Sequence, residues 1–161
     1  MILAVSSLAC ATTPRGSGPM EGLVVRHGDE GTLALERFGK ARAISSTERI
    51  TTQLGRLVGA SVAVRGGLAG DHGVRVRSFE LLDPGDGLAP MVGTVIADQF
   101  AIVIDDEITG TRLALRGAAL ADLREQHAAR VWITGSVVGP RQVLVAHWGL
   151  LLTADEAKSL R

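Results

Sequence analysis

The sequence predicts a mainly β protein built from two copies of one small unit. Residues 60–70 and 74–82 lie over residues 129–139 and 143–151 without a gap, all displaced by the same 69 positions (129 − 60). This constant register indicates an internal repeat. Most apolar segments are short, alternate with polar residues and are separated by turn-forming Gly and Asp, which favours strands. Helical periodicity is limited to two short interior segments and the C-terminal tail.

The first copy contains five predicted strands and one helix. Its strands are short runs with apolar residues at alternating positions, divided by Gly-rich and Asp-rich turns. They are expected at residues 22–26, 32–37, 40–44, 62–68 and 74–77. Between the third and fourth strands, Ser45 and Glu48 have the spacing of a capping box, and apolar side chains recur on one helical face. A helix is therefore expected over residues 45–59.

The second copy follows the same order. Its helix is expected over residues 118–128, and its strands at residues 93–96, 101–104, 111–115, 131–138 and 143–148. Residues 83–90 hold the densest turn chemistry of the interior, so the boundary between the copies falls there. The chain then divides into a signal remnant and tether, a first repeat, a linker, a second repeat and a short C-terminal helix. These parts cover residues 1–20, 21–82, 83–90, 91–152 and 153–161.

Three strands, a helix and two strands is the order of the oligonucleotide/oligosaccharide-binding (OB) barrel. Both copies contain a Gly-x-Val start, a Val-x-Val/Ile-x-Gly strand ending at Gly66 or Gly135, and a closing Val-x-Val. In this pattern, residues 22–82 and 93–151 resemble the small OB-fold domains of bacterial exported proteins of unknown function. The resemblance implies two tandem five-stranded OB-like barrels, and an SH3-like small barrel is the alternative. It also implies that ligands lie across the second and third strands and the loops that join the first strand to the second and the fourth to the fifth. These loops contain residues 27–31, 70–73, 97–99 and 139–142.

The N-terminus resembles a bacterial lipoprotein signal. Ser7-Leu-Ala-Cys10 is similar to a lipobox, although Ser7 stands where Leu is usual and no basic segment precedes it. Residues 11–19 are rich in Pro, Gly, Ser and Thr, as in a flexible tether. We expect lipidation of Cys10 and an exported protein, periplasmic or anchored to a membrane. The alternative is a disordered tail with one unpaired thiol.

Composition and motifs argue for a binding protein. Seventeen basic residues balance seventeen acidic ones, so a nucleic-acid partner is not expected, and the membrane is expected to be contacted only through the lipid. The sequence predicts no catalytic residue, no cofactor and no metal site, because it has no nucleophile triad, phosphate loop or metal-ligand spacing. His127 is expected on the inward face of the second helix. The acidic run 105–107 is expected to be a solvated turn.

Comparison of the two copies predicts unlike outer faces. If the strands alternate regularly, the side facing away from the core carries Arg65, Arg75, Arg77 and Phe79 in the first copy, and Trp132 and Trp148 in the second. The tryptophans either pack against the first copy or the C-terminal segment, or form a platform for a partner. The arginines either form a solvated face or follow a nucleic-acid strand. The candidate binding surface consists of the three arginines and two tryptophans.

The sequence therefore favours a non-enzymatic, exported, lipid-anchored binding or interaction module. Its partner would be a protein or a small ligand held on an OB sheet face. The alternative is a cytoplasmic tandem OB protein that binds single-stranded nucleic acid. The location of the protein distinguishes the two.

Overall fold

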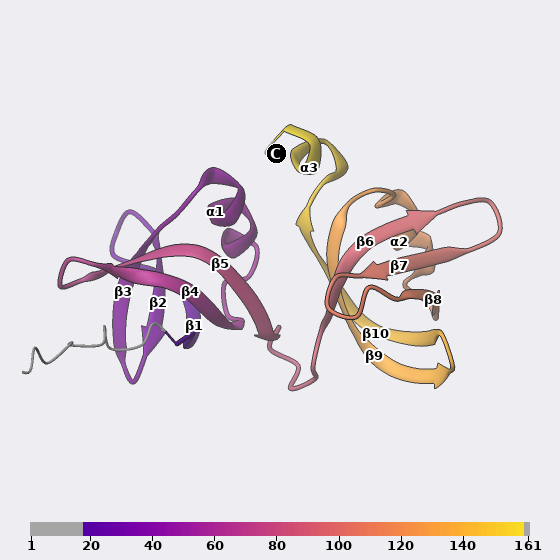
Figure 1. The fold of residues 1–161 in the computed structure, drawn as a ribbon, viewed down its shortest axis with the longest axis horizontal. Helices are drawn as coiled ribbons and strands as arrows, with labels where there is room; N and C mark the ends of the chain where they lie inside the picture. Colours follow the sequence, from indigo (N-terminus) through magenta and orange to yellow (C-terminus); the bar gives the residue numbers. More distant parts are fainter. Residues whose placement is uncertain (1–17, 160–161) are drawn as a thin grey trace, which may run out of the picture.

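The computed structural model describes residues 18–159, which form a mainly β structure, as the alternating sequence pattern predicts. Ten strands form two sheets of five, and three short helices accompany them in this part of the chain. The two sheets lie side by side along the long axis of the molecule, joined by the segment between β5 and β6 (Figure 1). Cys10, the predicted lipidation site, lies outside the described residues.

The first sheet closes into a five-stranded barrel. Its elements are β1 (Met20–His27), β2 (Thr32–Arg37), β3 (Lys40–Ser45), α1 (Glu48–Gly55), β4 (Ser61–Ala69) and β5 (Gly73–Asp83). The strands pair in the order β1-β2-β3-β5-β4, and β4 pairs back with β1. All pairs are antiparallel except β3 with β5. This parallel pair is possible because α1 and β4 separate the two strands in sequence.

The second sheet has the same order of elements and of strand pairs. Its elements are β6 (Met91–Ala97), β7 (Ile102–Asp106), β8 (Arg112–Arg116), α2 (Leu120–Glu125), β9 (Arg130–Gly139) and β10 (Gln142–Leu152), and α3 (Ala154–Ser159) follows. The strands pair as β10-β8-β7-β6-β9, and β9 pairs back with β10, so this ring is also closed. Gly22 lies opposite Val62 in the first ring, as Gly93 lies opposite Val131 in the second.

A β-bulge interrupts the long hairpin at the same place in both barrels. The register between β4 and β5 shifts at Gly66, which leaves Arg77 as the extra residue of β5. The register between β9 and β10 shifts at Gly135 and leaves Ala146 as the extra residue of β10. Glycine is required at both places, because a Cβ on Gly66 or Gly135 would lie 1.8 or 2.1 Å from a carbonyl oxygen of the partner strand. The close approach of the two strands thus depends on these glycines.

The bulge changes the face that the following residues occupy, and this corrects one prediction. Regular alternation places Phe79 and Trp148 on the outer face. The extra residue of the bulge moves every following side chain of the strand to the opposite face, so both rings point inward. Phe79 lies opposite Val64 and packs against the core of the first barrel. Trp148 lies opposite Ile133 and packs against the core of the second. Trp132 stays on the outer face, because the bulge at Gly135 adds its extra residue to β10 and leaves β9 regular from Val131 to Gly135.

Both interior helices are shorter than the sequence predicts. The N-cap of α1 is Thr47, without a side-chain cap hydrogen bond, so the predicted capping box of Ser45 and Glu48 is wrong. Each helix nevertheless supplies a side chain to a core. Leu54 of α1 and Leu123 of α2 are fully buried within the apolar clusters of the first and second barrels.

Candidate functional site at the junction of the two barrels

The outer face of the second barrel packs against the first barrel. Val92 of β6 pairs with Trp132 of β9, so both side chains point outward. Gly149 of β10 makes room for the indole ring, because a Cβ at this glycine would lie 2.6 Å from ring atoms of Trp132. Val92, Trp132 and Leu151 belong to the same apolar cluster as the core of the first barrel, and Leu151 is fully buried. We call this shared apolar contact the junction.

The linker between the barrels is attached to the same outer face. Thr134 of β9 is fully buried, and its hydroxyl donates a hydrogen bond to Asp86 Oδ2 at 2.6 Å. This bond holds the pKa of Asp86 below its usual value. Asp83 Oδ1 accepts hydrogen bonds from the backbone N–H groups of Gly85 at 2.7 Å and Gly87 at 3.0 Å. The linker is therefore an ordered turn, fixed at both its start and its middle.

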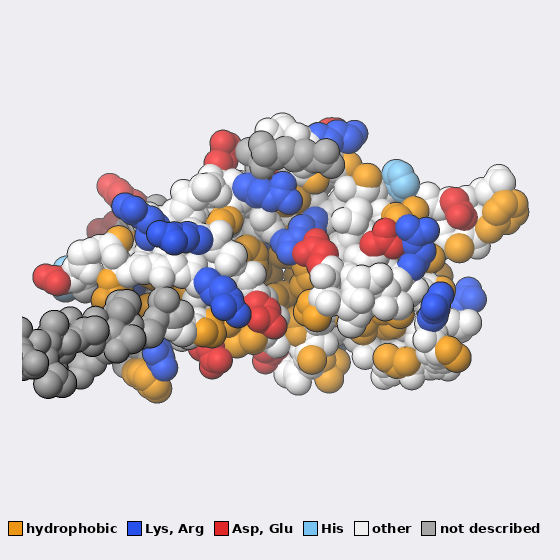
Figure 2. Space-filling model, viewed as in Figure 1, with side chains coloured by type: hydrophobic (Ala, Val, Ile, Leu, Met, Phe, Trp, Pro, Cys, Tyr) orange, Lys and Arg blue, Asp and Glu red, His pale blue; other side chains and the backbone are white. Residues whose placement is uncertain are grey.

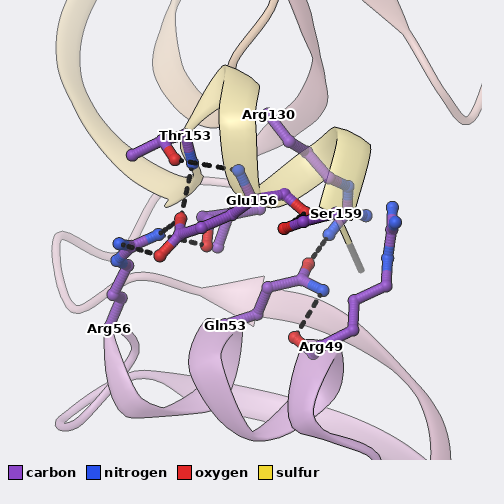
Figure 3. Close-up of polar contacts among 8 residues, drawn as sticks. Arg49, Gln53, Arg56, Arg130, Thr153, Glu156 and Ser159 are labelled. Atoms are coloured by element: carbon purple, nitrogen blue, oxygen red, sulfur yellow. Dashed lines mark hydrogen bonds and ion pairs between the residues drawn. The ribbon is translucent and has the colours of Figure 1, made fainter. Parts of the chain in front are cut away.

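An ion pair connects α3 to α1 across the junction (Figure 3). Arg56 donates from Nη1 and Nη2 to the two carboxylate oxygens of Glu156 at 2.8 and 3.0 Å, and from Nη1 to the Leu151 carbonyl at 2.9 Å. Glu156 also caps its own helix. Thr153 N donates to its carboxylate at 2.7 Å, and Glu156 N donates to Thr153 Oγ1 at 3.2 Å. The bonds from Arg56 and Thr153 lower the pKa of Glu156 to about 2.

A second polar chain joins β9 to α1. Arg130 donates from Nε and Nη2 to the carboxylate of Glu107 at 2.8 and 2.6 Å. Its Nη1 donates to the side-chain carbonyl of Gln53, which in turn donates from Nε2 to the Arg49 carbonyl at 3.0 Å. Figure 3 shows Arg130 and Glu156 approaching α1 from above at two places along the helix. The apolar junction thus has a polar rim on the side of α1.

A groove runs along the junction beside this rim. Its inner part is a cavity of about 220 Å³ whose apolar lining includes Leu81 and Val92. Its outer part is a wider depression of about 580 Å³, and Arg77 is one of the residues that line it. Phe79, Glu107 and Arg130 line both parts, which therefore lie next to each other. Figure 2 shows hydrophobic atoms in the gap between the barrels, with charged side chains of both signs beside it.

The structure separates the five residues of the predicted binding surface. Arg65, Arg75 and Arg77 are exposed on the first barrel, and none has a polar partner among the described residues. Only Arg77 lines the groove, whereas Arg75 lines a different depression beside β3. Trp132 lies in the junction and Trp148 against the core of the second barrel, so they do not form one open platform.

Other candidates from the sequence are engaged in local contacts. Asp105 forms an ion pair with Arg112, and Asp106 is buried and accepts hydrogen bonds from Thr109, so the acidic run is not one solvated turn. His127 is exposed rather than inward, and its Nδ1 accepts a hydrogen bond from Ala97 N at 3.0 Å. Within residues 18–159, His, Cys, Asp and Glu do not gather in threes as a metal site requires. In the same range no helix is sufficiently long and apolar to cross a bilayer.

Comparison with known proteins assigns no family to the chain. No protein-family model matches the sequence, and no curated protein matches it.

Replacing Trp132 by alanine is expected to lower the free energy of unfolding by about 3 kcal/mol, because the ring fills the contact between the barrels. Urea unfolding followed by circular dichroism measures this change. Phe100→Ala is the control, because its side chain is 86% exposed and its loss should change stability by at most about 0.5 kcal/mol. Equal effects of the two substitutions would contradict a structural role for the junction.

Glu156→Gln is expected to remove a pH-dependent part of the stability. Folding lowers the pKa of Glu156 from 4.5 to about 2, so the charged form stabilises the protein above pH 4.5 and this contribution disappears as the pH falls toward 2. The difference in unfolding free energy between wild type and variant should therefore be largest above that range and vanish at its lower end. Urea unfolding at a series of pH values measures it.

The control for this experiment is Asp155→Asn. Asp155 is the neighbouring acidic residue of α3, and its side chain is 99% exposed. This variant should keep the pH profile of the wild type. A Glu156→Gln variant whose deficit does not change with pH would contradict the role assigned to the Arg56–Glu156 pair.

Proposed function

We propose that the chain is a non-enzymatic, exported binding protein, anchored by a lipid at Cys10, whose two OB-like barrels hold a ligand in the groove between them. The OB-like architecture is supported by the position of each helix between the third and fourth strands and by the parallel pairing of the third strand with the fifth. Export and anchoring are supported by the lipobox-like Ser7-Leu-Ala-Cys10.

The position of Arg77 is the observation that carries the binding site. As the extra residue of the bulge, Arg77 forms part of the groove wall, and no described residue neutralises its charge. Bulges commonly redirect a side chain next to a functional site. The equivalent bulge of the second barrel contains Ala146, so the bulge itself does not require an arginine. The guanidinium is therefore available for an anionic group of a ligand.

The lining of the groove specifies the chemistry of this ligand. Arg77 would hold an anionic group by charge-assisted hydrogen bonds. The inner cavity, lined by Phe79, Leu81 and Val92, would receive an apolar group next to it. Two acidic residues also line the groove: the charge of Glu107 is offset by the ion pair with Arg130, and Glu80 is an exposed residue of the inner cavity. Arg49 adds another basic residue to the outer part, so basic residues predominate beside Arg77. The groove thus fits an amphipathic anion, either a small molecule or an apolar and acidic segment of a partner protein.

The fluorescent anion 8-anilinonaphthalene-1-sulfonate has this chemistry and serves as the probe. Arg77→Gln should weaken its binding about tenfold in a fluorescence titration, because one hydrogen bond to a charged group is lost. Arg75→Gln is the matched control, since Arg75 is also exposed and lies on the same strand but does not line the groove. It should bind the probe like the wild type. Equal affinities of all three proteins would overturn the assignment of the groove.

The lipid anchor has its own test. The full-length protein, expressed in bacteria with its native upstream region, should incorporate labelled palmitate and sediment with membranes. Cys10→Ser should abolish both, because the thiol that carries the lipid is lost. A soluble protein without label in either form would reject the anchor and favour the cytoplasmic alternative.

A further inference from the structure

We propose that the turn between β2 and β3, with Phe38 at its tip, docks onto an anionic phospholipid surface. The proposal rests on the proposed lipid anchor for its biological setting. It departs from the expectation that the protein contacts the membrane only through the lipid, because it adds a second contact with the bilayer. Its physical basis is the exposure, charge and position of this turn, which we call the Phe38 turn and which comprises residues 36–42.

The backbone conformation of the turn holds the side chain of Phe38 in the solvent. Its side chain is 90% exposed, the largest exposure of any large apolar residue that the structure describes. Its φ is +52°, a left-handed conformation that aromatic residues rarely adopt. The two-residue hairpin between β2 and β3 requires a positive φ at both Phe38 and Gly39, and this turn places the phenylalanine at its tip. An exposed aromatic ring at a turn is suited to the interface between lipid headgroups and acyl chains, where one side is apolar and the other is wet.

Basic side chains outnumber acidic ones beside this ring: Arg37, Lys40 and Arg42 line one depression with it, and Glu21 and Glu36 line another. The guanidinium of Arg37 lies 4.9 Å from the centre of the Phe38 ring. Lys40 is exposed on the other side of the turn, and Arg42 follows two residues later. Glu36 is the only acidic residue of residues 36–42, so the turn carries a net positive charge. An aromatic tip flanked by cations matches a surface of anionic headgroups above an apolar interior.

The site where the tether joins the barrel lies next to the Phe38 turn. Met20, at the start of β1, lines the same depression of about 300 Å³ as Phe38 and Lys40. Met20 lies ten positions after Cys10 (20 − 10), and ten residue steps span at most about 35 Å. A lipid at Cys10 would therefore keep this side of the first barrel close to the bilayer. Such tethering raises the effective concentration of the surface, so a weak intrinsic affinity suffices.

An exposed phenylalanine of the second barrel, Phe100, has different charged neighbours from Phe38. Phe100 is 86% exposed in the loop before β7, but the neighbouring Asp98 accepts hydrogen bonds from the backbone N–H groups of Phe100 and Ala101. Arg124 beside this loop offsets the charge of Asp98, so the surroundings of Phe100 lack the excess of positive charge found at the Phe38 turn. A single ring at the Phe38 turn is also a poor platform for a nucleic-acid strand, which binds through several stacked bases. The observations therefore favour a lipid surface.

Vesicle co-sedimentation of the full chain with Cys10→Ser tests the proposal without the lipid. This protein should bind vesicles that contain phosphatidylglycerol, should not bind vesicles of phosphatidylcholine alone, and should dissociate at high salt. Adding Lys40→Gln should weaken binding about fivefold, because one cation near the surface is lost. Phe38→Asn should also weaken it, and asparagine tolerates the positive φ, so the fold is retained. Phe100→Asn, the matched control, should bind like the parent protein.

Three results would overturn the proposal. They are equal binding to both kinds of vesicle, equal loss of binding in the Phe38 and Phe100 variants, and preferential binding of an oligothymidylate that Phe38→Asn abolishes. Urea unfolding of each variant verifies that the fold is retained.

Because the vesicle assay uses the Cys10→Ser protein, its outcome is independent of palmitate incorporation. A labelled protein without vesicle binding would thus reject the Phe38 turn alone, and vesicle binding without label would reject the anchor alone.

Discussion

The arrangement of this molecule depends on one apolar contact, in which the outer face of the second barrel is buried by the first. Exposed together, Val92, Trp132 and Leu151 would form a hydrophobic patch of the kind that soluble proteins cover. Covering it brings α1, α3 and β9 within hydrogen-bond distance of one another, so the ion pair of Arg56 and the chain through Arg130 depend on it. These polar groups in turn shield the contact from water, as the rim of an interface does. The groove exists only because the barrels meet here.

The sequence was sufficient to predict most of the fold. Alternating apolar residues identified the strands, and the constant displacement of Gly66 and Gly135 identified two equivalent hairpins. The face of Phe79 and Trp148 was predicted incorrectly, because alternation assumes an uninterrupted strand. A bulge adds one residue to only one of two paired strands. The alternation of apolar and polar residues does not show which strand has the extra residue. The sequence signal for the bulge was the glycine at positions 66 and 135, where the partner strand leaves no room for a Cβ atom.

The residues of the candidate site were harder to predict from the sequence than the strands were. Arg77 was among the predicted surface residues, but nothing near it in sequence distinguishes it from Arg75. The residues that build the rest of the groove and its rim come from distant segments: Arg56 and Glu156 lie 100 positions apart, and Gln53 and Arg130 lie 77 apart. The sequence spacing of a capping box also did not predict reliably where a cap forms. Ser45 and Glu48 have that spacing without the cap, whereas Thr153 and Glu156 form it.

The two barrels meet head to tail, through different surfaces of two similar units, and this has a consequence for assembly. Such a contact leaves one unused copy of each surface, and repeated addition of like units would produce an open fibre. The first barrel has the apolar residue Leu82 at the position of Leu151, but Ala63 at the position of Trp132 and Arg65 at that of Thr134. Its outer face thus lacks the ring that fills the contact, and a further barrel would bury the charge of Arg65 without a partner. Divergence between the copies thus makes the outer face of the first barrel a poor site for another unit of this kind.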